Sequence, residues 1–248
     1  PYRRQRQMCI RDRIIMKIAA IVLAGGSGSR MKSSVKKQYM LIGQKPVLYY
    51  SLRVFQSSDL IDEIVLVCGT EEIENCRKEI TQRYGFTKVK KIVAGGKERY
   101  HSVYEGLKAV PDCDYVMIHD GARPFVDEDM LERIWKELPK VRACTVGMMV
   151  KDTIKMSDEQ GYVSETLPRE KLWSIQTPQA FEYRFIRKIH DQVANGAQLS
   201  QKITDDAMLA EYIGKIRVKL IEGSYQNIKI TTPEDILFAE AIPVSYTH

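Results

Sequence analysis

One stretch decides the fold of this chain: Leu23-Ala24-Gly25-Gly26-Ser27-Gly28-Ser29-Arg30-Met31, continuing to Lys36-Lys37-Gln38-Tyr39. The apolar run that leads into it, residues 17–23, predicts a buried strand. Its glycines let the backbone turn sharply and expose N–H groups. Three cations surround these groups: Arg30, Lys36 and Lys37. Such a bend suits a polyphosphate, although a plain structural turn would use the same glycines.

Two common phosphate motifs do not fit this stretch. A Walker A motif is excluded because no Gly-Lys-Ser/Thr follows at the required spacing. The dinucleotide fingerprint is excluded because Met31 takes the third glycine position after Gly26 and Gly28. The stretch instead resembles the glycine-rich loop of nucleotidyltransferases, which join a sugar or polyol phosphate to a nucleotide.

Composition narrows the class of protein. The 248 residues carry a formal charge of +6, but five Arg and one Asp in residues 1–13 account for +4 of it and leave about +2 for the rest. A general nucleic-acid binder is therefore not expected. Five cysteines, an odd number with no close pair, argue against a disulfide framework or a zinc site and favour the reducing cytoplasm. No apolar run reaches the roughly 18 residues of a membrane span, and no signal-peptide pattern is present.

Both ends of the sequence look foreign. Residues 1–13 and 244–248 resemble translated sequencing-adaptor sequence, so we expect them to be non-native tails and the natural start to be Met16. The alternative for the first segment is a basic arm that seeks phosphate or membrane. Without repeats or a low-complexity linker, residues 16–243 are expected to form a single domain.

Strand and helix patterns alternate along the chain. Repeated strand–helix units predict an α/β fold with a mostly parallel twisted sheet and helices on both faces. The predicted strands are 17–23, 63–68, 89–93, 115–118 and 143–150; the predicted helices start at Pro46 and cover 70–85, 98–109 and 128–138, with Thr70 and Asp127 as caps. In the last third, helices are predicted at 182–194 and 205–213, capped by Thr204, strands at 216–221 and 227–230, and a final helix from Thr232-Pro233.

The alternation breaks at residues 151–167. Alternating residues flank a turn at Asp158-Glu159-Gln160-Gly161, which predicts a hairpin with no helix to cover it. A lone hairpin is marginal in water. We therefore expect an arm that packs on a second subunit, and hence a homodimer.

Four more blocks carry chemistry. In residues 95–103, Arg99 and Ser102 lie one helical turn apart behind two glycines, where the helix start favours an anion or a base carbonyl. A plain strand–helix connection would show the same pattern. In residues 119–124, Asp120 lies at the end of a predicted strand. A carboxylate in this position, beside phosphates, is where Mg²⁺ usually binds, and Arg123 would be a neighbouring cation or a buried ion-pair partner of Asp120. A general-base role for His119 is disfavoured, because a phosphate nucleophile is already ionised at neutral pH.

The last two blocks add cations. In residues 168–181, Arg169 could clamp a substrate phosphate with two hydrogen bonds, or form only a surface ion pair. In residues 227–235, Lys229 falls in a predicted apolar strand, where an unpaired lysine is costly. A bound phosphate would supply its counter-charge.

Together these five blocks resemble the cytidylyltransferase family that includes 2-C-methyl-D-erythritol 4-phosphate cytidylyltransferase, in order and rough spacing, over about residues 17–242. The resemblance implies a Rossmann-like fold of the nucleotide-diphospho-sugar transferase type, with a protruding β-arm at about 150–167. It implies that CTP and the polyol phosphate 2-C-methyl-D-erythritol 4-phosphate give 4-diphosphocytidyl-2-C-methyl-D-erythritol and pyrophosphate in the non-mevalonate isoprenoid pathway, with Mg²⁺ as cofactor.

The resemblance also implies a role for each matching residue. The catalytic residues would be Arg30, Lys37, Arg169 and Lys229, and Asp120 would hold the metal. The nucleotide would contact Ala24, Gly25, Gly26, Gly28, Gly96, Arg99, Ser102 and Asp120. The substrate would contact Asp120, Arg123, Thr153, Arg169, Thr177, Thr204 and Lys229. Of these, Thr153 would reach the site of the partner subunit.

Two departures and three alternatives accompany this reading. Lys36 stands where the family usually has proline, and Lys97 where relatives often have a small or acidic residue. A ribitol-5-phosphate cytidylyltransferase is the nearest alternative, but such relatives tend to carry Val at the position of Ala122 and to lack a counterpart of Lys155. A uridylyl- or adenylyltransferase for a sugar 1-phosphate would share only the first loop. A non-catalytic CTP-binding homologue is opposed by the intact cations and acid, namely Arg30, Lys37, Asp120 and Lys229.

Overall fold

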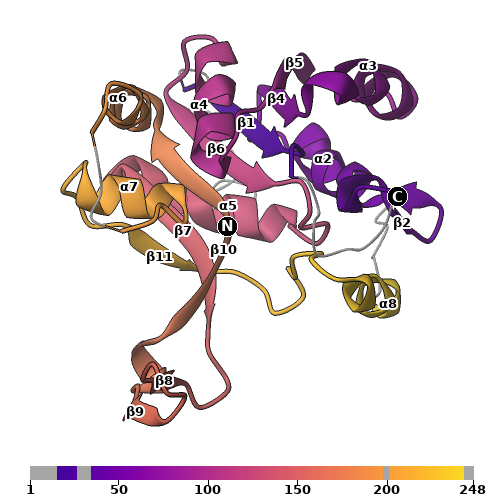
Figure 1. Ribbon diagram of the computed structural model, residues 1–248. Helices are drawn as coiled ribbons and strands as arrows, with labels where there is room; N and C mark the ends of the chain where they lie inside the picture. The colour runs from indigo at the N-terminus through magenta and orange to yellow at the C-terminus, as the bar shows by residue number, and fades with distance from the viewer. Residues whose placement is uncertain (1–15, 27–34, 198–200, 243–248) are drawn as a thin grey trace, which may run out of the picture.

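The computed structural model describes residues 16–26, 35–197 and 201–242 (Figure 1). Their centre is a seven-stranded sheet in the order β11-β7-β10-β6-β1-β4-β5. The strands are β1 (Ile18–Leu23), β4 (Glu63–Cys68), β5 (Val89–Ala94), β6 (Tyr115–Asp120), β7 (Ala143–Met149), β10 (Trp173–Glu182) and β11 (Lys219–Glu222). Every neighbouring pair is parallel except those of β10, which runs antiparallel to β6 and β7. The predicted mostly parallel sheet is confirmed.

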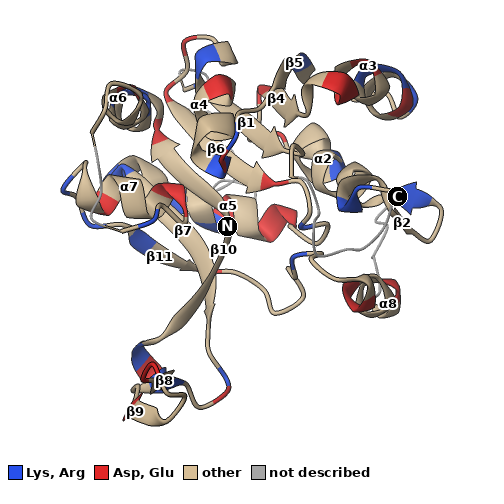
Figure 2. Cartoon of the chain, viewed as in Figure 1, with Lys and Arg blue, Asp and Glu red and all other residues tan. Residues whose placement is uncertain are grey.

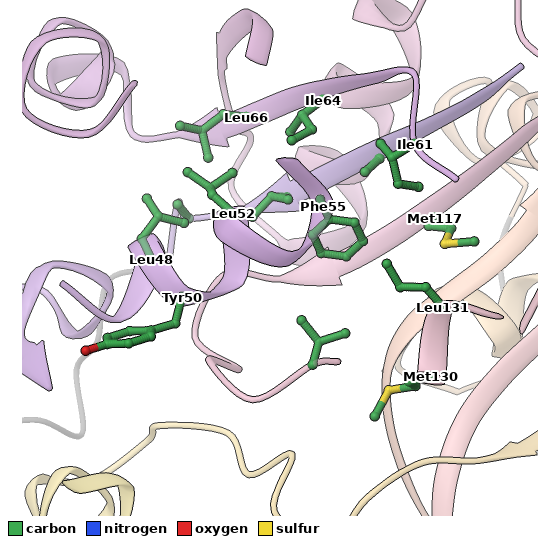
Figure 3. Close-up of a cluster of buried hydrophobic side chains, with 14 of the residues drawn as sticks. Leu48, Tyr50, Leu52, Phe55, Ile61, Ile64, Leu66, Met117, Met130 and Leu131 are labelled. Atoms are coloured by element: carbon green, nitrogen blue, oxygen red, sulfur yellow. The ribbon is translucent and has the colours of Figure 1, made fainter. Parts of the chain in front are cut away.

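Helices cover both faces of the sheet because its strands are apolar on both sides. On one face, α2 (Val47–Ser57) and α5 (Glu128–Val141) pack against Ile18, Ala20 and Val22 of β1, and Figure 3 shows Leu48, Leu52 and Phe55 of α2 in this core. On the other face, Ala19 and Ile21 of β1 meet three helices: α4 (Arg99–Ala109), α6 (Tyr183–Ala194) and α7 (Asp206–Tyr212).

Shorter elements complete the described chain. They are η2 (Lys37–Tyr39), β2 (Leu41–Ile42), β3 (Lys45–Pro46), η3 (Thr70–Glu72), α3 (Ile73–Asn75), η4 (Cys76–Gln82), η5 (Arg169–Lys171) and α8 (Pro233–Ala241). Pro233 opens α8 behind a Thr232 cap, as the sequence predicts. Lys and Arg are scattered over the molecule rather than gathered on one side (Figure 2).

The predicted arm projects from the body of the molecule (Figure 1). It consists of β8 (Lys155–Ser157) and β9 (Val163–Thr166), which pair antiparallel, and all of their residues are exposed. The turn between them uses Gly161 at a φ of 88°, a value that favours glycine. The hairpin is therefore confirmed, while its contact with a second subunit stays a prediction.

Of the two strands predicted in the last third of the chain, one is absent and the other begins later than predicted. Residues 227–230 form no strand; Asn227 is buried, and its amide donates to Thr177 O at 3.0 Å, so the segment is held by single contacts rather than by a sheet edge. The predicted strand 216–221 is instead Lys219–Glu222, because Ile216 and Val218 pack beside the α7 core before the chain joins β7.

Two predicted caps are also wrong. The cap of α7 is Asp205, whose carboxylate accepts the Met208 N–H at 2.9 Å, so Thr204 does not serve. Ahead of η3 the cap position is Gly69, and the carboxylate of Glu72 accepts its N–H at 2.9 Å, so Thr70 does not serve either. The Asp127 cap is confirmed by its hydrogen bond from the Met130 N–H.

Candidate active site

The glycine-rich stretch and Asp120 lie at the same edge of the sheet. Leu23, the last residue of β1, pairs with Asp120, the last residue of β6. The chain then turns through Ala24, which is buried, and through Gly25 and Gly26, which are exposed. The side chain of Lys37 returns to this turn, with its Cε 3.8 Å from where a Cβ on Gly26 would stand. Ala24, Gly26, Lys37 and Asp120 are thus brought to one edge.

Asp120 is the centre of the site. Its carboxylate accepts from Lys229 Nζ at 2.6 Å and from Arg99 Nε at 3.3 Å, and its side chain is 11% exposed. Burial alone would raise the pKa of this carboxyl, but Arg99 and Lys229 hold it well below its usual range. Asp120 is therefore ionised at neutral pH, and Lys229, which lies in a loop rather than a strand, finds its counter-charge here.

Arg99 and Ser102 approach the site from the start of α4. The guanidinium of Arg99 bonds Asp206 Oδ2 at 2.6 Å through Nη1, in addition to Asp120. Ser102 Oγ accepts the Gly96 N–H at 3.1 Å. A Cβ at Gly96 would collide with the side chain of His101, so a residue with a side chain does not fit this turn. The predicted grouping of Gly96, Arg99 and Ser102 at the helix start is found.

A chain of hydrogen bonds runs from the backbone of Asp120 through Thr177 and His119 to the backbone of Arg123. The Asp120 N–H donates to Thr177 Oγ1 at 3.1 Å, and Thr177 Oγ1 lies 3.0 Å from His119 Nδ1. His119 Nε2 lies 3.0 Å from Arg123 O. Because a carbonyl can only accept, Nε2 carries the proton and Nδ1 accepts from the Thr177 hydroxyl. Burial lowers the pKa of His119 to about 4, so the ring is neutral and supports the loop. A general-base role is not favoured.

Arg123 is turned toward the loop that carries Lys229. Its Nη1 donates to Asn227 O at 2.8 Å. Its Nε is buried and has no hydrogen-bond partner within the described residues, as is the case for Arg99 Nη2 and Asn227 Oδ1. Since buried donors and acceptors are normally paired, these three atoms are positions where a buried water molecule is expected.

Comparisons with known proteins decide the family. The family model of 2-C-methyl-D-erythritol 4-phosphate cytidylyltransferase matches residues 18–244. The chain belongs to this family. A curated member from Lachnoclostridium phytofermentans is 50% identical over 228 residues, covering 91% of this chain and 96% of its own length. One from Clostridium kluyveri is 49% identical over 223 residues, covering 90% and 95%.

A solved structure agrees with this assignment. The 4-diphosphocytidyl-2C-methyl-D-erythritol synthase of Anaerococcus prevotii has a TM-score of 0.79 at 37% identity, over 91% of this chain and 95% of its own. The chain is therefore a nucleotidyltransferase with the fold of this cytidylyltransferase family. Within the residues the structure describes, no helix is both long and apolar enough to cross a bilayer.

Other predicted site residues make no direct contact with Asp120 within the described residues, or fall outside them. Gly28 and Arg30 fall in the residues that are not described, as do both tails. Arg169 and Thr153 are exposed near the base of the arm, where Arg169 Nη1 donates to Lys151 O at 3.1 Å. Thr204 precedes α7, and its hydroxyl contacts Met208 Sδ at 3.6 Å. In the described part of the chain, no hydrogen bond or ion pair joins Arg169, Thr153 or Thr204 to Asp120.

One departure from the family pattern has a structural partner. Lys36 Nζ lies 3.0 Å from Glu72 Oε1, and Glu72 also accepts the Gly69 N–H. The pair ties the end of the glycine-rich stretch to the segment after β4. An added charge at this position therefore joins two loops, which a proline could not do.

The donor set at Asp120 limits what a metal could do there. Among the described residues no group of three His, Cys, Asp or Glu side chains could hold a metal ion. Both carboxylate oxygens of Asp120 already accept one bond from a cation, and each keeps a further lone pair. This fits Mg²⁺ that takes its other ligands from phosphate oxygens and water. It does not fit a metal held by protein side chains alone.

Two buried residues at the site escaped the sequence reasoning. Asp206 follows Asp205 at the start of α7 and looks like an ordinary acidic first turn. Asn227 looks like a strand residue, yet it receives Arg123 and supports the loop of Lys229. Two sequence signals could have indicated them. Asp206 is a second acid directly after the N-cap Asp205, and Asn227 is a polar residue in an otherwise apolar predicted strand.

Proposed function

We propose that the chain transfers the cytidylyl group of CTP to the phosphate of 2-C-methyl-D-erythritol 4-phosphate and releases pyrophosphate. The observation that carries this is the Arg99–Asp120–Lys229 cluster beside Gly26 and Lys37 at one edge of the sheet. Parallel sheets bind ligands at the carboxyl ends of their strands. Positively charged side chains on both sides of Asp120 could bind the triphosphate of one substrate and the phosphate of the other close together.

The reaction needs positioning more than proton transfer. An oxygen of the substrate phosphate attacks the α-phosphorus of CTP, a new P–O bond forms, and the bond to the leaving pyrophosphate breaks with its electron pair. The attacking phosphate is already ionised, so no general base is required. Arg30 and Lys37 would stabilise charge on the α-phosphate, and Lys229 with Arg169 and Arg123 would hold the substrate phosphate.

The nucleotide and polyol would occupy opposite sides of Asp120. Ala24, Gly25, Gly26 and Gly28 would receive the triphosphate, while Gly96, Arg99 and Ser102 would face the cytidine. Thr177 and Thr204 would lie toward the polyol. Mg²⁺, bound by Asp120 together with phosphate oxygens, would offset the charge of the triphosphate.

The assembly we propose is a homodimer in the cytoplasm, formed through the arm. The arm strands are wholly exposed, with Val163 of β9 at 62% and Tyr162 just before it at 74%, and such an uncovered hairpin is marginal alone. A second subunit would cover it and receive Thr153. Residues 16–243 would act as one domain in each subunit. Four free, buried cysteines in the described chain agree with a reducing compartment.

One assay tests the reaction and its alternatives. Pyrophosphate release is measured with CTP, UTP or ATP against 2-C-methyl-D-erythritol 4-phosphate, ribitol 5-phosphate or a sugar 1-phosphate. We expect turnover with CTP and the methylerythritol phosphate at a rate at least about tenfold above every other pair. Faster turnover with ribitol 5-phosphate would overturn the substrate assignment. CTP binding without turnover for any pair would overturn the enzymatic proposal.

A further inference from the structure

We propose that Asp206 is a positioning residue for this reaction, which acts by holding the guanidinium of Arg99 against Asp120, and that His190 holds Asp206 in turn. The inference rests on the proposed function. It adds two residues, on α7 and α6, that touch neither the phosphates nor Asp120 themselves.

Asp206 is a buried carboxylate fixed at both oxygens. Its exposed fraction is 0%, and Oδ2 accepts from Arg99 Nη1 at 2.6 Å. Oδ1 lies 3.2 Å from His190 Nε2, and the ring of His190 is 1% exposed. The backbone N–H of Asp206 donates to Gln179 Oε1 at 3.0 Å. A carboxylate taken out of water is costly unless its partners are in place, so these contacts define a single orientation.

Arg99 passes this orientation on to the site. A guanidinium is planar and its donors are fixed relative to one another. With Nη1 on Asp206, the group presents Nε to Asp120 at 3.3 Å. The third nitrogen, Nη2, is buried and has no partner in the described chain. Asp206 thus sets the contact of Arg99 with Asp120.

The charges around Asp120 depend on this arrangement. Asp120 is shared by Arg99 and Lys229, and Asp206 supplies a second anion that belongs to Arg99. If Asp206 loses its charge, Asp120 becomes the sole anionic partner of Arg99. Arg99 then competes with Lys229 for Asp120. Because Lys229 is the cation proposed to hold the substrate phosphate, turnover should fall more than nucleotide binding.

The substitution Asp206→Asn removes the charge with little change in shape. The asparagine oxygen can still accept from Arg99, and its NH₂ group would face His190, whose ring nitrogen can accept in the other tautomer. Packing is therefore retained. Asp191→Asn is the matched control, because Asp191 lies next to His190 on α6 and accepts from Tyr104 and Arg187 instead of Arg99.

The experiment is a double-mutant cycle on pyrophosphate release with CTP and the methylerythritol phosphate. We expect Asp206→Asn to lower kcat about tenfold to hundredfold and to raise the KM for CTP by a smaller factor, because Arg99 also faces the nucleotide. Arg99→Gln should lower kcat as well, and adding Asp206→Asn to Arg99→Gln should cost less than about twofold more. Asp191→Asn should stay within about twofold of the wild type.

A second variant tests the role of His190. His190→Gln keeps a donor toward Asp206 and should cost less activity than His190→Leu, which has none. Urea midpoints identify any variant that is unfolded in the assay. The inference is overturned if Asp206→Asn leaves kcat unchanged, or costs as much in the Arg99→Gln background as in the wild type. An inactive wild-type protein would overturn the proposed function instead.

Discussion

Acidification should destabilise this fold through one buried ring. His119 is 0% exposed, and burial lowers its pKa from the usual 6.5 to about 4. Between these two values the unfolded chain binds a proton at this ring and the folded chain does not. Stability is therefore fully present above about pH 6.5 and is lost as the pH falls toward about 4. One pKa unit corresponds to about 1.4 kcal/mol, so the whole window amounts to about 3 kcal/mol.

Other groups act outside this window or with the opposite sign. Burial raises the pKa of Asp120 and Asp206, but Arg99 lowers both below the usual 3.8, so their stabilisation is lost only at lower pH. Burial raises the pKa of Glu63, which therefore stabilises the fold as the pH falls. These contributions are common to the wild type and to a variant that changes His119 alone, so they cancel in the difference.

The measurement is urea unfolding at about pH 7 and about pH 4.5. The wild type should lose about 2 kcal/mol more than His119→Gln between these conditions. Phe55→Leu is the control, because the Phe55 ring lies 5.2 Å from that of His119. Phe55→Leu should lower the free energy of unfolding by about 1 kcal/mol or more at both pH values, and the change in this free energy between the two pH values should equal that of the wild type. If the wild type and His119→Gln lose the same free energy of unfolding between the two pH values, the assignment of a neutral buried ring is refuted.

The nucleotide loop, the metal seat and the arm each allow a direct test. Lys37→Ala should lower kcat more than about tenfold, or roughly 1.4 kcal/mol of barrier, in the pyrophosphate assay; unchanged turnover in a folded variant would contradict its role. Lys36→Ala should lower the free energy of unfolding by less than about 1 kcal/mol in urea, since its pair with Glu72 is partly exposed. In calorimetry, Mg²⁺ alone should give no binding heat, whereas Mg²⁺ with CTP should, because cations surround Asp120; binding of the metal alone would contradict this. Val163→Asp on the exposed arm should convert dimers to monomers in light scattering, and an unchanged mass would count against assembly through the arm.

Local patterns were sufficient to predict the frame of the fold. The apolar runs of β1 and β4 predict buried strands, and both form almost as expected. A strand that is apolar on both sides is stable only where both of its faces are covered, as they are in the middle of a parallel sheet. The position of Asp120 at a strand end beside the glycines also followed, since parallel strands end at a common edge.

Tertiary contacts explain what the patterns missed. No strand was predicted at β10, where Pro178 interrupts the run, and the register shift between Ile175 and Gln179 absorbs it. The segment 227–230 has strand-like residues but no neighbouring edge to pair with. Asp206 looks like a helix-capping acid, and only the fold brings Arg99 and His190 to it. Roles of this kind depend on residues far apart in sequence, so spacing alone does not reveal them.

The reversed strand β10 connects the arm to the site. Because β10 runs against β7, Met149 at the end of β7 pairs with Trp173 at the start of β10, and both lie at the carboxyl edge of the sheet. The segment that joins them holds β8 and β9, so the arm must begin and end at the edge where Asp120 lies. The same reversal carries Thr177 against the Asp120 N–H. A second subunit that covered the arm would therefore lie near the site. The same edge of the sheet would then carry both the contact between subunits and the reaction.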